Sequence, residues 1–274
     1  MVSHVNGLPR SFYADGFQPL AEVSRPTRLM IGTDGHGSTG KSEFFLSCPD
    51  PGMVIGLDRM IDSCLRNPNP PRTRRRNFAI KMMTVPSEGQ LGSAQEYLPY
   101  WTDFYSWYIK ALNNKDARTV AIDGDDLSWE LQRLAAFGKL TQVVPSRYHD
   151  PYTARKVMYN RAWDSGKVVI FTNKLKKEYA ILLDANGRPV LDKNGQPKRE
   201  WTGKFERQGF PDQEFLFHLQ LTHLYDPAEG YGIRITMCKH NRSLEGDELW
   251  GSDCNFPALV RHVYPEVPAR EWGL

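Results

Sequence analysis

One short segment combines glycines, a lysine and a hydroxyl residue in the spacing G-x-x-x-x-G-K-[ST]. Glycines let the backbone turn so that successive N–H groups face one anion. The lysine of such a loop reaches phosphate oxygens, and the hydroxyl that follows can ligate Mg²⁺. The spacing therefore predicts a loop that binds the phosphates of a nucleotide. The residues expected to bind it are Gly35, His36, Gly37, Ser38, Thr39, Gly40, Lys41 and Ser42.

Carboxylates that follow two other apolar runs could complete this chemistry. Asp123 ends the run "TVAID", and we expect it to hold Mg²⁺ together with Ser42, partly through water. Asp123 could instead cap the helix that follows, although Asp125 or Asp126 is better placed for that role. Asp58 ends the run "VIGLD" and could act as a general base toward water, or cap the next helix.

The elements that must position these residues alternate along the chain. Apolar runs predict strands, and stretches with apolar residues at helical spacing predict helices between them. This alternation predicts an α/β fold with a mostly parallel sheet covered on both faces, in which ligands bind at the carboxyl ends of the strands. Strands are expected at 27–32, 52–58, 77–85, 117–126 and 167–173, and helices at 41–48, 93–114, 127–138 and 150–166.

After residue 174 the pattern changes to short β-like runs. Two Asn-Gly pairs predict hairpin turns within 174–210, and later runs that include 231–242 predict further, antiparallel strands. We therefore expect an N-terminal arm at 1–27, a core at 28–245 that carries a basic insertion at 174–210, and a tail at 246–274 with little regular structure.

Composition narrows the class of protein. The chain has 274 residues with a net charge of +3, so any surface for nucleic acid must be a local patch. The four cysteines form no C-x-x-C pair, which favours reduced thiols over a zinc site or a disulfide framework. No apolar run is long enough to span a membrane, and no secretion signal is recognisable at the N-terminus. We expect a cytoplasmic protein.

The order of several segments resembles that of RecA-like P-loop ATPases, especially the small single-domain recombination ATPases and nucleotide-binding proteins of bacteriophages. The segments are "GHGSTGKS", "VIGLDRMID", "TVAIDGDD", "VVIFTNKLK" and "ITMCKHNR", and they span roughly residues 28–245. The resemblance implies a RecA-like fold that binds ATP and Mg²⁺, and for a phage-encoded chain it implies the host cytoplasm.

The resemblance also implies roles for individual residues. An acid in the position of Asp58 activates water in this family, although the family usually has Glu there. Asn173, beside Lys174, lies where the family commonly senses the terminal phosphate with Gln; it could also be a simple strand-end residue. Lys239 and Arg242 resemble basic residues that a neighbouring subunit supplies to that phosphate. Their alternative role is that of a solvated strand end. The implied catalytic set is Lys41, Asp58, Asp123, Asn173, Lys239 and Arg242.

In RecA-like proteins two loops hold DNA, and by position these correspond to 139–150 and 174–210. The second segment interleaves basic residues with Tyr179, Trp201 and Phe205, whose rings could stack on bases. Charge runs are often only solvated, so this alternative stays open. The candidate contacts with single-stranded DNA are Arg72, Arg74, Arg75, Arg76, Lys176, Lys177, Lys198 and Arg199.

The leading hypothesis is Mg²⁺-dependent ATP binding and hydrolysis coupled to single-stranded DNA binding, in phage DNA recombination or replication and in a homo-oligomer. A second hypothesis is a nucleotide-binding switch or assembly factor that does not hydrolyse ATP, which the aspartate at position 58 favours. A third is a nucleotide or nucleoside kinase, in which the basic segment 72–76 would form part of a lid.

Overall fold

The computed structural model describes residues 4–5, 8–9, 28–61, 64, 77–140 and 143–274. Most of the arm predicted at 1–27 lies outside the described residues, as does the basic cluster at 72–76. The strands are β1 (His4–Val5), β2 (Leu8–Pro9), β3 (Leu29–Gly35), β4 (Gly52–Gly56), β5 (Phe78–Met82), β6 (Thr119–Asp123), β7 (Val168–Thr172), β8 (Leu175–Ile181), β9 (Arg199–Arg207), β10 (Leu219–Asp226), β11 (Gly230–Cys238) and β12 (Glu248–Trp250). The helices are α2 (Lys41–Phe45), α4 (Ala94–Asn113), α5 (Asp125–Phe137), α6 (His149–Asp164), α7 (Gln213–Leu216) and α8 (Phe256–Val263), with 3₁₀ turns η1 (Pro145–Tyr148), η2 (Arg242–Leu244), η3 (Gly251–Asp253) and η4 (Ala269–Trp272).

An eight-stranded sheet in the order β12-β11-β10-β3-β7-β6-β4-β5 forms the centre of the fold. The strands from β10 to β5 are parallel to their neighbours, and β11 and β12 add antiparallel pairs at one edge. Every residue of β3, β6 and β7 is buried, as expected for strands covered on both faces. The structure thus confirms the predicted α/β class. It differs in β10, which pairs antiparallel with β11 but parallel with β3.

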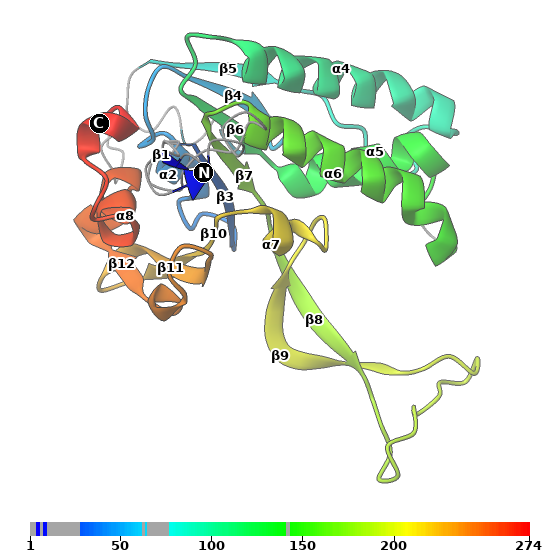
Figure 1. The fold of residues 1–274 in the computed structure, drawn as a ribbon. Helices are drawn as coiled ribbons and strands as arrows, with labels where there is room; N and C mark the ends of the chain where they lie inside the picture. Colours follow the sequence, from blue (N-terminus) through cyan, green and yellow to red (C-terminus); the bar gives the residue numbers. More distant parts are fainter. Residues whose placement is uncertain (1–3, 6–7, 10–27, 62–63, 65–76, 141–142) are drawn as a thin grey trace.

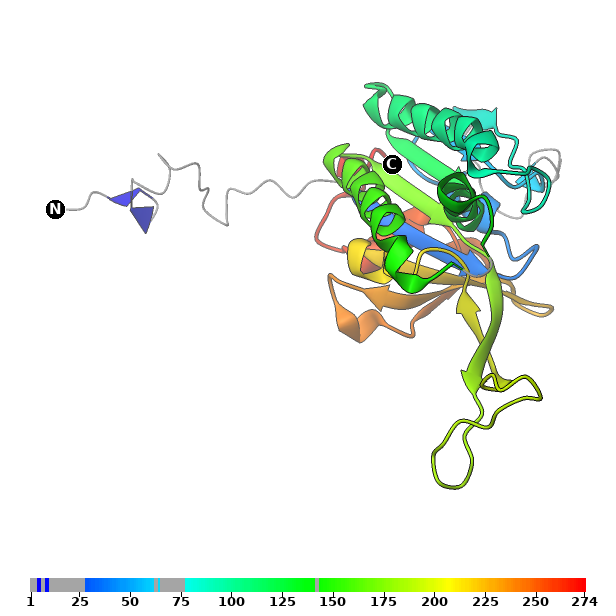
Figure 2. The same ribbon diagram turned by 90° about the vertical axis from the view of Figure 1, so that its right-hand side faces the viewer.

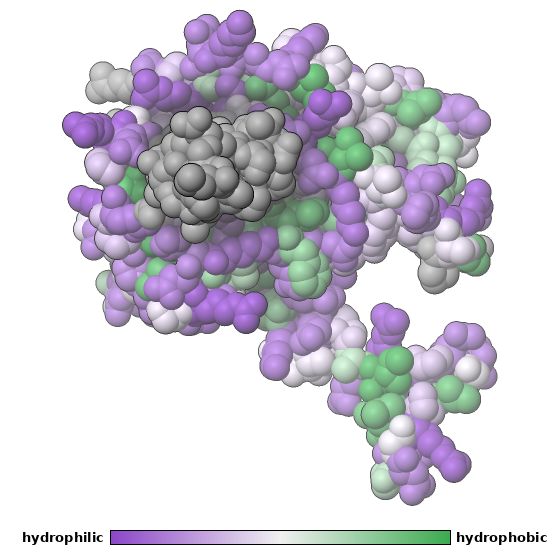
Figure 3. All heavy atoms as spheres, in the orientation of Figure 1, coloured by the Kyte–Doolittle hydropathy of each residue, from purple (hydrophilic) through white to green (hydrophobic). Residues whose placement is uncertain are grey.

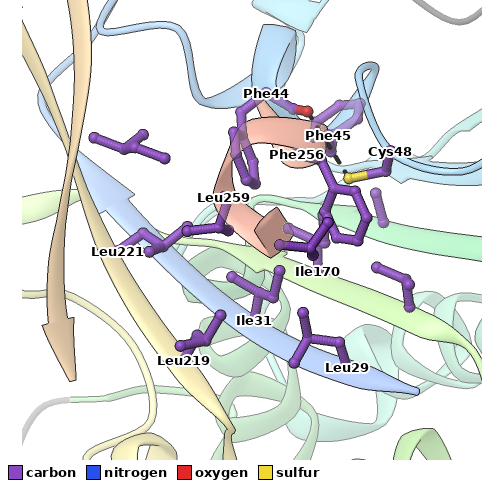
Figure 4. Packing of buried hydrophobic residues seen from close by; sticks show 14 of the residues in the cluster. Leu29, Ile31, Phe44, Phe45, Cys48, Ile170, Leu219, Leu221, Phe256 and Leu259 are labelled. Atoms are coloured by element: carbon purple, nitrogen blue, oxygen red, sulfur yellow. Dashed lines mark hydrogen bonds between the residues drawn. The ribbon is translucent and has the colours of Figure 1, made fainter. Parts of the chain in front are cut away.

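Two apolar layers fill the space on either side of the sheet. Helices α4, α5 and α6 cover one face (Figure 1). Rings such as Tyr108, Tyr159 and Phe171 pack together there. On the other face α2 and α8 pack on β3 and β10, with Phe256 and Leu259 of α8 entering the cluster (Figure 4). Helix α8 is a regular element in the segment that we expected to be a tail with little regular structure.

The register of the sheet aligns the carboxyl ends of its central strands. Gly56 of β4 lies beside Asp123 of β6, which in turn pairs with Thr172 of β7. On the other side of β3, Gly35 pairs with His223 of β10. The loops that leave β3, β4, β6 and β7 therefore begin at one common edge.

Strands β8 and β9 form a separate antiparallel hairpin that projects away from the body of the protein (Figures 1 and 2). Beyond it, two successive turns share the pattern L-D-x-N-G-x-P, at 183–189 and 191–197. In each turn the aspartate carboxylate accepts two backbone N–H groups, in one case through Asp184 and in the other through Asp192. These turns confirm the hairpin signals of the two Asn-Gly pairs.

The structure also bears on the cysteines and on membrane-spanning segments. Among the described residues, none of Cys48, Cys64, Cys238 and Cys254 is joined to another in a disulfide. Within the described parts of the chain, no helix combines the length and apolar character needed to cross a bilayer.

Candidate nucleotide-binding site

The loop between β3 and α2 has the backbone conformation that its glycines allow. Gly40 adopts φ +85° and Gly35 adopts φ +152°, and Ser38 is also left-handed at φ +62°. A side chain at Gly35 would meet the Thr39 hydroxyl at 2.7 Å from its Cβ. The glycines at 35 and 40 are therefore required by this turn. The structure places the whole predicted phosphate loop along one wall of a pocket of about 500 Å³.

Lys41 folds back over the loop from the first position of α2. Its Nζ donates to the backbone carbonyls of Gly35 at 2.8 Å and His36 at 2.7 Å. Burial lowers the pKa of Lys41, while the surrounding aspartates, with Asp123 the strongest and Asp34 next, oppose the shift. The ammonium group is thus held at the mouth of the loop, where the phosphates of a bound nucleotide could replace the carbonyls as acceptors.

Asp123 ends β6 next to the phosphate loop. One carboxylate oxygen accepts the Ser42 hydroxyl at 3.1 Å, and the other accepts the Thr172 hydroxyl at 2.7 Å. Thr172 Oγ1 in turn accepts the backbone N–H of Gly124 at 2.9 Å, so neighbouring strands fix the carboxylate. Burial raises the pKa of Asp123, and the two hydroxyl donors oppose that rise.

The donor set at this point suits Mg²⁺, which prefers oxygen ligands and retains several waters. Ser42 and Asp123 supply a hydroxyl and a carboxylate that already touch. In the described parts of the chain no three His, Cys, Asp or Glu side chains converge to hold a metal alone. The residues therefore fit a magnesium ion shared with nucleotide phosphates, where it would neutralise negative charge.

Asp58 reaches the same pocket from the end of β4, but it is already paired. Its carboxylate accepts Lys174 Nζ at 3.0 Å and the backbone N–H of Met60 at 3.0 Å. Burial alone raises the pKa of Asp58, but these two hydrogen bonds hold it below its ordinary value. A carboxylate in this state binds protons weakly and is a poor base.

Asn173 follows β7 and is almost completely buried beneath the pocket. Its side-chain N–H donates to Gln213 Oε1 at 3.0 Å, across the start of α7. Gly209 passes over it with φ +127°, and a Cβ there would lie 2.7 Å from Asn173 Oδ1. The amide of Asn173 therefore links the sheet edge to the return of the hairpin. Its predicted role in sensing phosphate stays a prediction.

The start of α5 adds two acidic residues, Asp125 and Asp126, for which the sequence alone suggests only a helix-capping role. The residue before the helix is Gly124, and no side chain caps that end. Asp125 instead turns inward to Arg155, and both side chains are fully buried. Asp126 lines the pocket, and among the described residues no other group donates a hydrogen bond to either of its buried carboxylate oxygens. The adjacent acids in "DGDD" were the one sequence signal for this feature.

Lys239 and Arg242 lie away from the phosphate loop. Cys238, the last residue of β11, pairs with Leu219 at the start of β10, whereas the loop leaves the opposite edge of the sheet beside His223. Lys239 Nζ donates to the Phe215 carbonyl at 2.5 Å. The structure brings Ser42, Asp58, Asp123 and Asn173 together with the phosphate loop, but not these two cations of the same chain.

The hairpin of β8 and β9 touches the phosphate loop at its base. The Phe205 ring packs edge-on against the His36 ring, with centroids 4.5 Å apart. Of the candidate DNA contacts, Lys176 pairs with Glu206 at 3.1 Å and Lys177 lies over the Trp201 ring at 4.9 Å. Lys198 and Arg199 are exposed on the same arm. Arg72, Arg74, Arg75 and Arg76 lie outside the described residues.

Comparison of the chain with protein-family models and with curated proteins finds no match. Among solved structures, one similar structure is that of the KaiC-like protein PH0186 from the hyperthermophilic archaeon Pyrococcus horikoshii OT3. It aligns with 81% of this chain and 84% of its own, at 14% sequence identity and a TM-score of 0.42.

Proposed function

We propose that this protein is a RecA-like P-loop ATPase that binds ATP with Mg²⁺, hydrolyses it, and couples that cycle to single-stranded DNA. The observation that carries the proposal is one pocket. Its lining combines the phosphate loop, which ends at Ser42, with Asp123 and with further acids and a lysine. Such a set of residues suits the binding and transfer of a phosphoryl group better than the binding of a neutral ligand.

The residues divide the work of phosphoryl transfer. Backbone N–H groups and Lys41 bind the phosphates, so negative charge that develops on them is stabilised. Ser42 and Asp123 would hold Mg²⁺, which supplies further charge neutralisation. Thr172 fixes the orientation of Asp123 through its 2.7 Å hydrogen bond. The chain thereby orders the reacting group before any water attacks.

The hairpin supports single-stranded nucleic acid as the partner, because its two faces differ. The register puts Lys177 opposite Phe205, Tyr179 opposite Trp201 and Ile181 opposite Arg199 on one face. This aromatic and basic face is exposed, with Trp201 and Phe205 each 45% accessible and apolar side chains gathered along the arm (Figure 3). Exposed rings flanked by cations suit stacking on unpaired bases and contact with phosphates.

The opposite face of the hairpin is acidic and polar. Lys176 is paired there with Glu206, and Glu178 accepts the Thr202 hydroxyl at 2.7 Å. Glu200 lies across from Ala180 on the same face. This face attracts a polyanion less than the other does, and the candidate contact Lys176 lies on it, paired with Glu206. The asymmetry therefore favours a nucleic acid that lies along one side of the arm.

The proposal extends to a homo-oligomer and to phage DNA recombination or replication. Lys239 and Arg242 lie at the edge of the sheet opposite to the phosphate loop, so within one chain they have no role at the nucleotide. In a head-to-tail assembly the same edge of a neighbouring copy could reach the terminal phosphate. The phage setting rests on the order of the sequence segments alone.

ATP turnover with and without a single-stranded oligonucleotide tests the proposal directly, with Lys41→Ala as the inactive control. We expect Mg²⁺-dependent release of phosphate that rises with the oligonucleotide and is absent in the variant. No turnover in either condition removes hydrolysis from the proposal. Turnover that is indifferent to DNA, together with no oligonucleotide binding, removes the partner.

One observation favours a switch that binds ATP without hydrolysing it. The acid expected to activate water, Asp58, is held by Lys174. Tight ATP binding without phosphate release over hours would support this second function.

A further inference from the structure

Asp126 is the most unusual charged side chain of the pocket. It is 2% exposed, and no other described residue donates a hydrogen bond to either carboxylate oxygen. Leaving a buried carboxylate without donors is costly, and such groups are rare in folded proteins. Those that occur inside clefts often serve chemistry, where an unpaired carboxylate is available to a ligand.

Asp126 shares its pocket with the residues proposed to bind the phosphates. It lies in the first turn of α5, three residues after Asp123, and it lines the same pocket as Lys41, Asp58 and Lys174. Gly209 passes close to its backbone, with the position of an added Cβ 3.6 Å from Asp126 Cα. The return of the hairpin thus packs close to this residue, which also contributes to the lining of the pocket.

Asp58 and Asp126 differ in their hydrogen bonding and in the direction in which their pKa is shifted. Asp58 accepts two hydrogen bonds, one from a cation, and these hold its pKa below the ordinary value. Burial raises the pKa of Asp126 to about 6. A base that works near neutral pH needs a free lone pair and a pKa close to the working pH. Asp126 meets both requirements and Asp58 meets neither.

We propose that Asp126, and not Asp58, is the catalytic base that takes the proton from the attacking water. This inference rests on the proposed ATP hydrolysis. The water oxygen bonds to the terminal phosphorus, and the bond from that phosphorus to the bridging oxygen breaks, leaving its electron pair on ADP. The water proton passes to the Asp126 carboxylate. Lys174 keeps Asp58 paired and thereby holds one side of the pocket in position.

Two near-isosteric substitutions test the assignment, Asp126→Asn and Asp58→Asn, each measured for kcat and for equilibrium ATP affinity. General bases contribute about 10²–10⁴-fold to rate. We expect Asp126→Asn to lower kcat by about 100-fold or more while ATP affinity is kept or increased, because a negative charge near the triphosphate is removed. Asp58→Asn should lose less than about 10-fold. The exposed Asp116→Asn serves as the neutral control.

The pH profile supplies a readout that a structural role would not change. A base must be deprotonated, so kcat of the wild type should fall as pH decreases through the pKa of Asp126. The charged groups that act on it are Lys174, Asp125, Asp58 and Lys41. In Asp126→Asn the residual rate should lose this acidic limb.

Several results would overturn the assignment. It fails if Asp126→Asn keeps more than a third of the wild-type kcat, if Asp58→Asn is the more damaging change, or if Asp126→Asn loses ATP affinity in parallel with rate. A wild-type protein that binds ATP but never hydrolyses it overturns the proposed hydrolysis, and the base role with it. The two failures are distinguishable, because only in the first does the wild type turn over.

Discussion

Asp125→Asn should destabilise the protein strongly, because it removes the charge at the centre of a buried network. Arg155 is fully buried and donates to the Asp125 carboxylate and to Ser128 Oγ, the latter at 2.8 Å. Tyr159 donates to the other carboxylate oxygen at 2.7 Å, and Gln213 donates to the same oxygen at 3.0 Å. Burial alone lowers the pKa of Arg155, yet the neighbouring Asp125 carboxylate raises it above its ordinary value.

The size of the destabilisation follows from the loss of the negative charge that compensates the buried Arg155. The amide that replaces the carboxylate leaves the guanidinium charged and fully buried without a counter-ion. Breaking a buried pair in this way costs about 3–5 kcal/mol. At about 2–4 °C for each kcal/mol in a protein of this size, the thermal midpoint should fall by about 6–20 °C.

Denaturation by heat and by urea measures the effect, and Lys156→Ala is the matched control. Lys156 lies next to Arg155 on the same helix and pairs with Asp212 at 2.9 Å, but its side chain is 48% exposed. An exposed pair contributes about 0–1 kcal/mol, so this variant should change little. A loss below about 1 kcal/mol in Asp125→Asn, or equal losses in both variants, would refute the reasoning about burial.

Four further outcomes are expected. Asp126→Asn should stabilise the ligand-free protein by about 1–3 kcal/mol at pH 8, because burial raises the folded pKa to about 6 and the charged form is penalised above it. Since the penalty disappears once the group is protonated in both states, the gain should vanish below about pH 4 in denaturation curves. Trp201→Ala should weaken binding of a labelled oligonucleotide about 5–150-fold in fluorescence anisotropy, whereas Thr202→Ala on the other face should not. Gly209→Ala should cost about 1–3 kcal/mol of unfolding free energy, because φ +127° disfavours a side chain and its Cβ would clash with a neighbouring amide oxygen. Lys41→Ala should abolish the rise in thermal midpoint caused by ATP with Mg²⁺, because the variant lacks the ammonium group that is held over the loop to meet the phosphates.

The sequence predicts those parts of the fold that depend on local pattern. The strands β3, β6 and β7 are buried along their whole length and mostly apolar, so their type and parallel arrangement follow from composition and from the helices between them. The meeting of Ser42 with Asp123 also follows, because the carboxyl ends of neighbouring parallel strands share an edge.

What the sequence does not predict depends on pairing between distant residues. The strand that pairs in parallel with β10 is β3, which lies nearly 190 residues earlier in the chain. Helix α8 has a clear apolar face, but it lies in a segment rich in Gly and Pro that suggested a tail. The contrast between Asp125 and Asp126 is invisible in "DGDD", because it arises from Arg155, some 30 residues later in the chain.

The ring contact between His36 and Phe205 has a thermodynamic consequence. It directly joins the turn that we propose binds the nucleotide to the base of the arm that we propose binds nucleic acid. Any coupling free energy between the two binding sites must be the same whichever ligand binds first. If ATP raises the affinity of the arm for its ligand by some factor, that ligand must raise the affinity for ATP by the same factor. The substitution Phe205→Ala removes this ring contact. It should therefore reduce both affinity ratios toward one, and by the same amount.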